Sequence, residues 1–390
     1  MSAPAPARLA SIDAYRGFVM FLMMAEVLHF GRMAKAFPDS PFWQFLGLHQ
    51  SHVEWRGCTL HDLIQPSFSF LVGVALPFSI ASRVAKGQSV LRMFGHAGLR
   101  AVLLVLLGVF LRSMGKKATN WTFEDTLSQI GLGYVFLFAL GLARSLWHWV
   151  AFAAILVGYW ALFAVWPAPG PEFDWKAVGV TANWPHHPTG FEAHWDKNAN
   201  PAYAFEQWLY HQLPRANQHN GGGYATLSFI PTLATMILGL IAGTWLKTMS
   251  GWPAVGRFLA VGLLLLGIGY GLDHSGICPS VKRIWTPTWV IFSGGWCFVL
   301  LGLFSAATDA VASPGWSYPL RVIGANSIVA YCGSHLIEDF LLGSFKTHFG
   351  SDVFQHFGKD YEPFVSGVAL LAVYWLILWW MYRNKIFVRI

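Results

Sequence analysis

Long apolar runs, rather than amphipathic stripes, dominate the pattern of hydrophobic and polar positions along this chain. Four runs contain almost no ionisable residue: 102–111, 151–165, 259–268 and 368–380. A helix needs about 20 largely apolar residues to cross the hydrocarbon core of a bilayer. About ten segments meet or nearly meet this requirement, and their centres lie near residues 23, 71, 106, 136, 157, 236, 264, 298, 332 and 373. The pattern therefore predicts an all-α, polytopic transmembrane bundle of about ten spans.

The composition agrees with a protein that lives in a bilayer. Of the 390 residues, 55% are hydrophobic and 12% are charged, whereas soluble chains carry about a quarter charged residues. The 20 Trp and 12 Tyr residues fit aromatic belts at two membrane interfaces. Arg8 and Arg16 precede or open the first span, and no small-residue cleavage site follows it, which predicts an uncleaved signal anchor. We expect one multi-pass domain over residues 1–390, in the plasma membrane or a bacterial inner membrane.

The formal net charge of +7 does not indicate a nucleic-acid partner. The Lys and Arg residues lie between the spans, and no basic run is interleaved with aromatic residues. Outside the long loop, slightly more of them fall on the side that holds the termini, and positive residues mark cytoplasmic loops. Of the acidic residues, only Asp13 and Asp309 fall on that side. We therefore place both termini in the cytoplasm.

The opposite face carries most of the candidate chemistry. All His residues except His96 and His148 lie there, and so does the only long loop, residues 167–224. This loop is polar, aromatic and rich in proline, which is typical of a lid or substrate platform rather than of a domain. We find no convincing internal repeat, which counts against an inverted-repeat transporter. The four Cys residues are too few for a disulfide framework, and we expect them to be unpaired.

Ionisable residues in or beside a span are costly, so each is a candidate for a functional role. Asp13 and Arg16 are three residues apart on the first predicted helix, share a face and could pair. Such a pair can anchor the helix end at the interface or belong to a site. Glu26 lies deeper or at the far interface, where a carboxylate must face protein or water rather than lipid.

The densest cluster precedes and opens the second predicted span, and its members are His49, His52, Glu54, Trp55, His61 and Asp62. The His spacings match no compact zinc motif, so we expect no metal. A His–Asp acid/base pair is chemically more natural, because an imidazole accepts a proton from an amine or hydroxyl and a carboxylate fixes its tautomer. Pro66 and Pro77 follow, and we expect them to break the helix beside a polar cavity.

Later segments hold further polar candidates, namely Asp273, His274, Lys282, Arg283, Asn326, Ser327, His335, Glu338 and Asp339. Each of them could be structural; buried amides such as Asn326 usually bind backbone or another helix. The chain contains no phosphate-binding glycine loop, serine-nucleophile elbow or zinc-protease helix.

Five motifs occur in a recognisable order, at residues 8–17, 52–73, 227–243, 282–289 and 324–331. The most specific begins His52-Val-Glu-Trp55-Arg-Gly57 and continues through Asp62-Leu63 and Pro66 to Gly73. With these motifs the chain resembles the heparan-alpha-glucosaminide N-acetyltransferase family of membrane acetyltransferases and their bacterial relatives. The resemblance extends over about residues 8–382. It implies that an acetyl group moves from cytosolic acetyl-CoA to an amino sugar or related glycan on the far side of the membrane.

The resemblance places the family's active-site histidine on His52 and its Asp-Leu pair on Asp62–Leu63. We expect His52 to act as general base or as nucleophile, and Asp62 to orient it. The acceptor or both substrates would contact Glu26, Trp55, Asn326 and Ser327. Acetyl-CoA would be bound on the cytoplasmic side, its phosphates held by some of the cations. The predicted cofactor-binding residues are Asp13, Arg16, Arg83, Arg100, Arg144 and Arg321.

Two departures from the family pattern concern both substrates. Glu26-Val27 stand where the family usually has an Asn, and Ser128-Gln129 stand where it has a Gln-Arg pair. The first changes how an acceptor amine or hydroxyl is held, and the second removes a positive charge that could meet acetyl-CoA.

Two other functions remain open on the sequence alone. A transporter or flippase for a polar or acylated solute would also use intramembrane charges and broken helices. A non-catalytic sensor or assembly protein could use the 167–224 loop as a docking face. Exposed aromatic spans would permit a homodimer in any of these cases.

Overall fold

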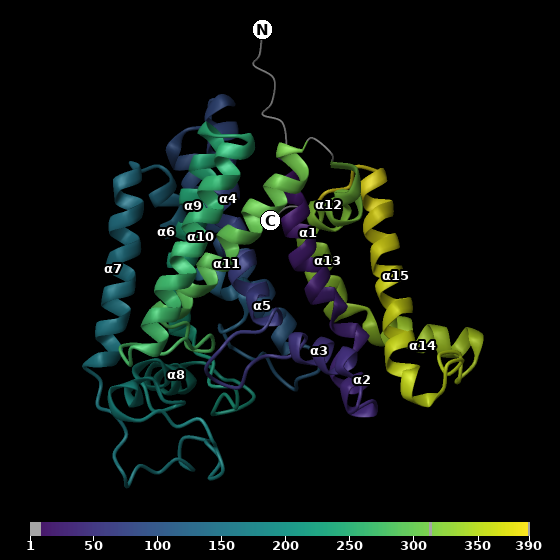
Figure 1. Ribbon diagram of the computed structural model, residues 1–390, viewed down its shortest axis with the longest axis horizontal. Helices are drawn as coiled ribbons and strands as arrows, with labels where there is room; N and C mark the ends of the chain where they lie inside the picture. Colours follow the sequence, from purple (N-terminus) through teal and green to yellow (C-terminus); the bar gives the residue numbers. More distant parts are fainter. Residues whose placement is uncertain (1–8, 312–313, 389–390) are drawn as a thin grey trace. The chain divides into compact units, whose positions relative to one another are not determined.

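The computed structural model describes residues 9–311 and 314–388 (Figure 1). Arg8, which opens the first family motif, lies outside this part of the chain. The described residues are helical apart from turns, loops and one isolated β-bridge between Arg56 and Val281. Their contacts define two compact units, which we describe one at a time. Unit 1 contains Glu54–Gly57 and Gln65–Gly302, and unit 2 contains 9–53, Cys58–Ile64 and 303–388 with its gap.

Unit 1 is built mainly from long apolar helices. Its longest loop contains one shorter helix, α8. The helices are α4 (Ile64–Ala85), α5 (Val90–Ser113), α6 (Thr126–Gly141), α7 (Ser145–Ala164), α8 (Pro201–Gln212), α9 (Phe229–Thr248), α10 (Gly251–His274) and α11 (Pro287–Ser305). Polar side chains accept from backbone N–H groups at the starts of three helices, as Asp125 does for α6 and Asn200 for α8.

Helix α9 forms the centre of unit 1, because most of its apolar window is buried while other helices of the unit face outward. It packs on α4 through glycines that allow backbone contact. A Cβ built on Gly239 would lie 1.9 Å from the carbonyl oxygen of Phe70, and one on Gly73 would lie 1.9 Å from that of Met236. Small residues of this kind let membrane helices approach closely.

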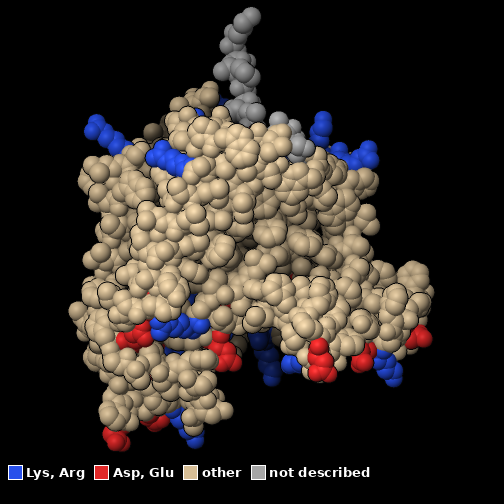
Figure 2. All heavy atoms as spheres, in the orientation of Figure 1, with Lys and Arg blue, Asp and Glu red and all other residues tan. Residues whose placement is uncertain are grey.

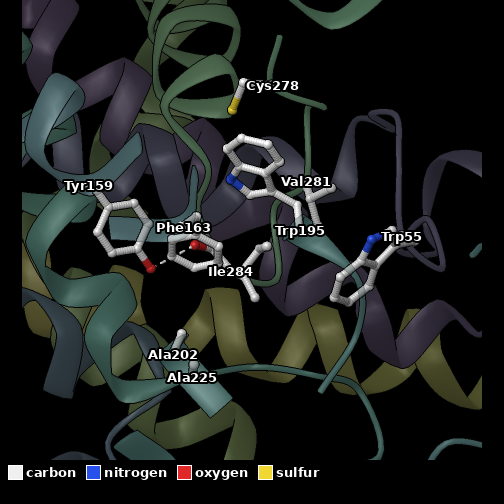
Figure 3. Packing of buried hydrophobic residues seen from close by; sticks show 9 residues of the cluster. All are labelled: Trp55, Tyr159, Phe163, Trp195, Ala202, Ala225, Cys278, Val281 and Ile284. Atoms are coloured by element: carbon white, nitrogen blue, oxygen red, sulfur yellow. Dashed lines mark hydrogen bonds between the residues drawn. The ribbon is translucent and has the colours of Figure 1, made fainter. Parts of the chain in front are cut away.

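The 167–224 loop is less irregular than its composition predicts. It contains a 3₁₀ turn, Gly190–Trp195, and helix α8. Trp195 is fully buried, and its ring stacks against Phe163 of α7 with centroids 6.2 Å apart. Figure 3 shows this pair within a cluster that also holds Trp55, Val281 and Ile284. The loop is therefore fastened to unit 1 by aromatic packing.

Unit 2 has shorter and more broken helices. They are α1 (Ala10–Met24), α2 (Phe30–Ala36), α3 (Pro41–His49), α12 (Tyr318–Ala325), α13 (Ser327–Leu336), α14 (Glu338–Phe349) and α15 (Glu362–Arg383). Helix α1 packs on α12, again through glycines: a Cβ on Gly17 would lie 1.8 Å from the carbonyl oxygen of Leu320. Figure 1 shows α12 and α13 beside α1.

Both described ends of the chain lie at the same end of unit 2. Gly324 packs on the backbone of Asp13, near the start of α1. Its near neighbour Asn326 hydrogen-bonds the backbone at Ile386 and Val388. This is the arrangement expected for an even number of spans; the assignment of that end to the cytoplasm stays a prediction.

Seven helices among the described residues are long and apolar enough to cross a membrane, or eight if the bent pair formed by 10–28 and 30–36 is one span. All the segments predicted from the sequence are helical. Those centred near 136 and 332 are too short to count, because α6 has 16 residues and the second segment is divided between α12 and α13. The total of about ten spans therefore stays a prediction.

The surfaces of these helices match a bilayer. Apolar side chains point outward along α5, α7, α10 and α15, for example Leu106, Val157, Leu264 and Trp380. In each unit, taken by itself, the middle of the face seen in Figure 2 is almost free of Lys, Arg, Asp and Glu side chains. The chain is an integral membrane protein with an all-helical architecture.

The Cys and Pro residues bear on two predictions made from the sequence. The four Cys residues are free, as expected. The prolines do not break the second predicted span: α4 is continuous from Ile64 to Ala85. Pro66 lies in the first turn, where its missing N–H costs no helical hydrogen bond, and the helix continues past Pro77. The break lies instead in the first predicted span, at His29, which adopts a left-handed conformation with φ of 50°.

Candidate active site

The segment between α3 and α4 folds around one buried carboxylate, that of Asp62. This side chain is 0% exposed. Its Oδ2 atom accepts from the backbone N–H groups of Val53 (3.3 Å) and Thr59 (3.0 Å) and lies 3.0 Å from the Thr59 hydroxyl. Its Oδ1 atom lies 2.8 Å from Nδ1 of His52. A carboxylate held in this way keeps a fixed orientation.

The contact between His52 and Asp62 is the one that the sequence predicts. The carboxylate accepts from Nδ1–H, so the neutral imidazole carries its acceptor lone pair on Nε2. His52 is 39% exposed, whereas its carboxylate partner is buried. A half-exposed imidazole whose tautomer is fixed by a buried carboxylate can accept a proton from a nucleophile.

A second histidine lies against the first. The rings of His52 and His61 have centroids 4.6 Å apart and are tilted by 47°. His61 is 9% exposed, and its Nε2 atom lies 3.2 Å from Oε1 of Glu26, which is 56% exposed. His61 belongs to the cluster seen in the sequence, but its partner is 35 positions away and could not be assigned from spacing.

Glu26 is positioned by the break in the first predicted span. Residues Ala25–Leu28 form a 3₁₀ turn, His29 reverses the backbone twist, and α2 starts at Phe30. Such a break leaves backbone groups without helical partners, which is tolerated at membrane depth only where protein satisfies them. The Gln50 side chain does so: Oε1 accepts from the N–H of Phe30 and Nε2 donates to the carbonyl of Ala25, both at 2.6 Å.

Replacing Gln50 by alanine should therefore destabilise the protein. Two backbone groups would lose their partners, at a cost of about 1–3 kcal/mol each when buried. Gln44→Ala is the matched control, because Gln44 also bonds the backbone, at Ala34, but in an exposed position. Thermal unfolding of the detergent-purified variants measures the difference. Equal losses of stability in the two variants would mean that the Gln50 contacts do not support the break.

A pocket of about 350 Å³ opens beside Glu26 within unit 2. Its polar lining comes from the end of α13 and the start of α14, as well as from Glu26. The lining residues are Met23, Glu26, Val27, Ser334, His335, Glu338 and Asp339. Three carboxylates and one imidazole make this pocket suited to a cationic or hydroxyl-rich ligand.

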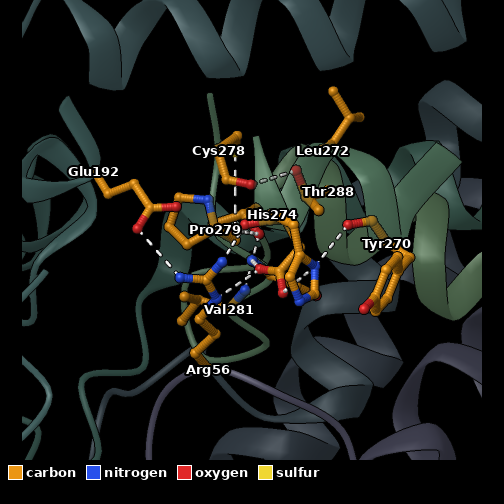
Figure 4. A network of polar contacts seen from close by, with 12 residues as sticks. Arg56, Glu192, Tyr270, Leu272, His274, Cys278, Pro279, Val281 and Thr288 are labelled. Carbon is orange, nitrogen blue, oxygen red and sulfur yellow. Dashed lines mark hydrogen bonds and ion pairs between the residues drawn. The ribbon is translucent and has the colours of Figure 1, made fainter. Parts of the chain in front are cut away.

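Trp55, a predicted substrate contact, lies in unit 1 and is 2% exposed. Its ring packs edge-on against Trp184, and its indole nitrogen has no hydrogen-bond partner among the described residues. The next residue, Arg56, fastens this segment to two other parts of unit 1 (Figure 4). Its guanidinium bonds Asp273 at 2.9 Å and Glu192 at 3.2 Å. The structure supports a packing role for Trp55; contact with substrate stays a prediction.

Asn326 and Ser327 lie at the junction of α12 and α13 in unit 2. Asn326 is fully buried, and both ends of its amide are engaged, with the carbonyl of Ile386 and the N–H of Val388 at 3.0 Å. Ser327 is half-buried. Of these two predicted substrate residues, Asn326 holds the C-terminal segment in place.

The predicted cofactor residues of unit 2 gather at one helix pair. Arg16 and Asp13 form the expected ion pair at 3.3 Å on α1. Arg16 precedes Gly17, whose backbone touches Leu320 of α12, and Arg321 follows Leu320. Arg16 and Arg321 are thus sequence neighbours of the two residues that form one close helix contact, at the end of unit 2 that holds the chain ends.

The predicted cofactor residues of unit 1 are more varied. Arg83 lies in the last turn of α4 and donates to Gln88, and Arg144 is exposed at the start of α7. Arg100 lies well inside α5 rather than at its end, and its guanidinium bonds the Tyr134 hydroxyl at 3.0 Å. An arginine at this depth is held by its aromatic partner, so its distance from the helix end weakens the case for phosphate contact.

Gln129, at one of the departures from the family pattern, is buried in unit 1. Its amide lies 3.2 Å from the carbonyl oxygen of Thr226 and 3.3 Å from that of Ala225. This residue ties α6 to the segment that leads into α9.

The 167–224 loop contains a further His–Asp pair that the sequence analysis did not single out. His187 Nδ1 lies 2.8 Å from Oδ2 of Asp196. Burial raises the pKa of Asp196, although His187 opposes the shift. Burial also lowers the pKa of the neighbouring Lys197, whose ammonium lies 3.9 Å from the Trp184 ring centroid. In the sequence, the run 186–196 could have indicated this pair, because it is rich in His and acidic residues.

Within residues 9–311 and 314–388, no group of three His, Cys, Asp or Glu side chains is arranged to hold a metal ion. The His52–Asp62 site therefore offers acid/base groups and hydrogen bonds from its own side chains. The expectation that no metal is needed stays a prediction.

Comparison with curated proteins supports the family resemblance. The chain is 22% identical to the human heparan-alpha-glucosaminide N-acetyltransferase over 424 residues, covering 99% of this chain. It is likewise 22% identical to the mouse protein of the same name, covering 98% of this chain. The chain spans 60% of the length of these relatives. No protein-family model matches it. The similarity is distant but extends over the full chain, which confirms the resemblance stated from the motifs.

Proposed function

We propose that this chain is a membrane acetyltransferase that moves an acetyl group from acetyl-CoA to an amino sugar or related glycan. The observation that carries the proposal is the buried Asp62 carboxylate, fixed by three contacts to Oδ2 and aimed through Oδ1 at the half-exposed His52. The printed names of the two curated relatives supply the reaction class. Acetyl-CoA would come from the cytoplasm and the acceptor from the other side of a plasma membrane or bacterial inner membrane.

In the general-base form of this proposal, His52 Nε2 accepts a proton from the acceptor while its nitrogen or oxygen attacks the thioester carbonyl. The C–S bond breaks, and the thiolate receives a proton. Asp62 keeps the tautomer and stabilises the imidazolium. In the covalent form, Nε2 itself attacks the thioester, and the acetyl-imidazole passes its acetyl group to the acceptor. The same geometry supports both forms.

The donor would be held by cations at the end of unit 2 that carries the chain ends. Arg16 and Arg321 flank the close α1–α12 contact, and guanidinium groups bind phosphate oxygens in a bidentate manner. Asp13 orients Arg16 through the ion pair at 3.3 Å. Arg83 and Arg144 are further candidates, and Arg100 is the weakest because it engages Tyr134.

The acceptor would enter the pocket beside Glu26. The carboxylates of Glu26, Glu338 and Asp339 suit an ammonium or several hydroxyl groups. Glu26 is the substrate contact best supported by geometry, because it lines this pocket and also touches His61. Ser327 remains a candidate for positioning, whereas the amide of Asn326 is already engaged by backbone.

The test is label transfer by purified protein. Acetyl-labelled acetyl-CoA is incubated with glucosamine and a panel of amino sugars, and the products are identified by mass spectrometry. The proposal predicts acetylated sugar in amounts that grow with protein and time, and none with labelled acetate as donor. Protein that is folded but acetylates no member of the panel would contradict the proposal.

A transporter remains the second candidate, because the break at His29 is the kind of feature that transporters also use. It predicts counterflow of solute in liposomes without any acetylated product.

A further inference from the structure

Glu26 and His61 form a second carboxylate–histidine pair that lies directly against the first. The Glu26–His61 contact is 3.2 Å, the His52–Asp62 contact is 2.8 Å, and the two imidazole rings are 4.6 Å apart. The four side chains thus follow one another as carboxylate, imidazole, imidazole and carboxylate. One pair is enough for a general base, so the second requires a separate explanation.

Glu26 also lines two pockets of unit 2. The first is the acidic pocket of about 350 Å³ with His335, Glu338 and Asp339. The second, of about 340 Å³, is more open and more basic. Its lining residues are Glu26, His29, Gly31, Arg32, Lys35, Gln50 and His61. A group in the acidic pocket can therefore reach the second pocket through Glu26 and His61.

The number of protons in the reaction shows what this arrangement can do. An amino-sugar amine is largely protonated near neutral pH, and an ammonium nitrogen has no lone pair with which to attack. The first N–H proton must leave before the attack, and a second leaves as the C–N bond forms and the C–S bond breaks. One of the two protons ends on the thiol of CoA, and the other is released to water. His52 can hold only one proton at a time.

On the premise of the acetyl transfer proposed above, we propose that Glu26 and His61 remove the first proton and His52 and Asp62 remove the second. Glu26 receives the ammonium group in the acidic pocket. The pair takes up one proton as a unit, which converts the neutral imidazole to an imidazolium whose charge the carboxylate offsets. Water in the second pocket then removes that proton. His61 exchanges this proton with Glu26 and does not touch the substrate, so we class it as a positioning residue.

This assignment gives a function to the half-exposed Glu26 carboxylate beside the His52–Asp62 pair. An amide at position 26 could hold a neutral amine but could not take its proton. The charged groups around Glu26 fit the same path: His335, Glu338 and Asp339 favour a cation on the substrate side. The second pocket, where the proton is released, disfavours a bound cation because its lining includes His29, Arg32 and Lys35.

The test compares the pH dependence of kcat/KM for an amino-sugar acceptor in the wild type, Glu26→Gln and His61→Gln. In either variant, only acceptor that is already deprotonated can react. Its kcat/KM should then fall roughly tenfold for each pH unit below the pKa of the acceptor amine. The kcat/KM of the wild type should fall by less than about threefold over the first pH unit below that pKa, since the pair takes the proton within the site. Above that pKa, the kcat/KM of each variant should come within about threefold of the wild-type value.

An alkoxyamine acceptor, whose nitrogen is neutral throughout this pH range, should rescue both variants at low pH. The matched controls are Glu362→Gln, which removes an exposed ion pair with Lys346, and His348→Gln on the exposed face of α14. Both controls should follow the wild-type profile.

Each outcome decides the inference. Variant profiles parallel to the wild type, or an equal loss at every pH, would overturn the role of the second pair and leave the proposed acetyl transfer in place. Failure of the folded wild type to acetylate any amino sugar would overturn the proposed function, and this inference with it. If Glu26→Gln does not fold, His61→Gln gives the same measurement, since it removes the other half of the pair.

Discussion

An alanine in place of His52 is expected to lower kcat for acetyl transfer by about 10²–10⁴, the usual contribution of a general base. Asp62 Oδ1 lies 2.8 Å from Nδ1 of the imidazole, so the substitution also removes one contact of a buried carboxylate, while its Oδ2 atom keeps its contacts to Val53 and Thr59. A loss larger than this range would favour the covalent acetyl-imidazole route. The measurement is steady-state transfer of labelled acetyl to glucosamine, with His348→Ala as the control.

The Asp62→Asn variant gives the complementary result. Its amide would present an N–H group to His52 or to the N–H donors of Val53 and Thr59, so the tautomer of the imidazole would no longer be fixed. We expect a loss within the same range, and a double variant no worse than His52→Ala alone, because the two residues act as a unit. Full activity in either single variant would place the catalytic base elsewhere.

The second large effect concerns stability. Gly239→Ala would place a methyl group 1.9 Å from the carbonyl oxygen of Phe70, a separation at which the α4 and α9 backbones must move apart. We expect a loss of at least about 3 kcal/mol, at or beyond the upper end for overpacked cores. Gly267→Ala on α10 is the matched control, because a Cβ there meets nothing within 4 Å.

Thermal unfolding in detergent measures the difference between these two alanine variants. A Gly239→Ala protein as stable as Gly267→Ala would show that α4 and α9 do not pack closely through these glycines.

The sequence predicted the elements of this fold better than their breaks. Every segment predicted to span is helical, because long apolar runs leave no other way to satisfy the backbone in a bilayer. The break was assigned to Pro66 and Pro77 but lies at His29. Proline in a first turn costs no hydrogen bond, whereas a left-handed histidine stabilised by Gln50 has no local sequence signature.

The candidate site was predicted only where its residues lie close together in the sequence. His52 and Asp62 are ten positions apart in one compact loop, so chemistry and spacing could join them. Glu26 and His61 meet only because α1 ends where it does, and no periodicity in the sequence fixes that point. Trp55 is buried by Trp184, a residue more than a hundred positions away, which a local pattern cannot indicate.

Sided proteoliposomes distinguish acetyl transfer by this protein from transport of either substrate. Acetyl-labelled acetyl-CoA is supplied outside, and glucosamine is trapped inside. In the population with the donor side facing outward, we expect labelled N-acetylglucosamine inside the vesicles and no acetyl-CoA there. Labelled acetyl-CoA inside, or efflux of unmodified glucosamine without any acetylated product, would rule out acetyl transfer and identify a transporter.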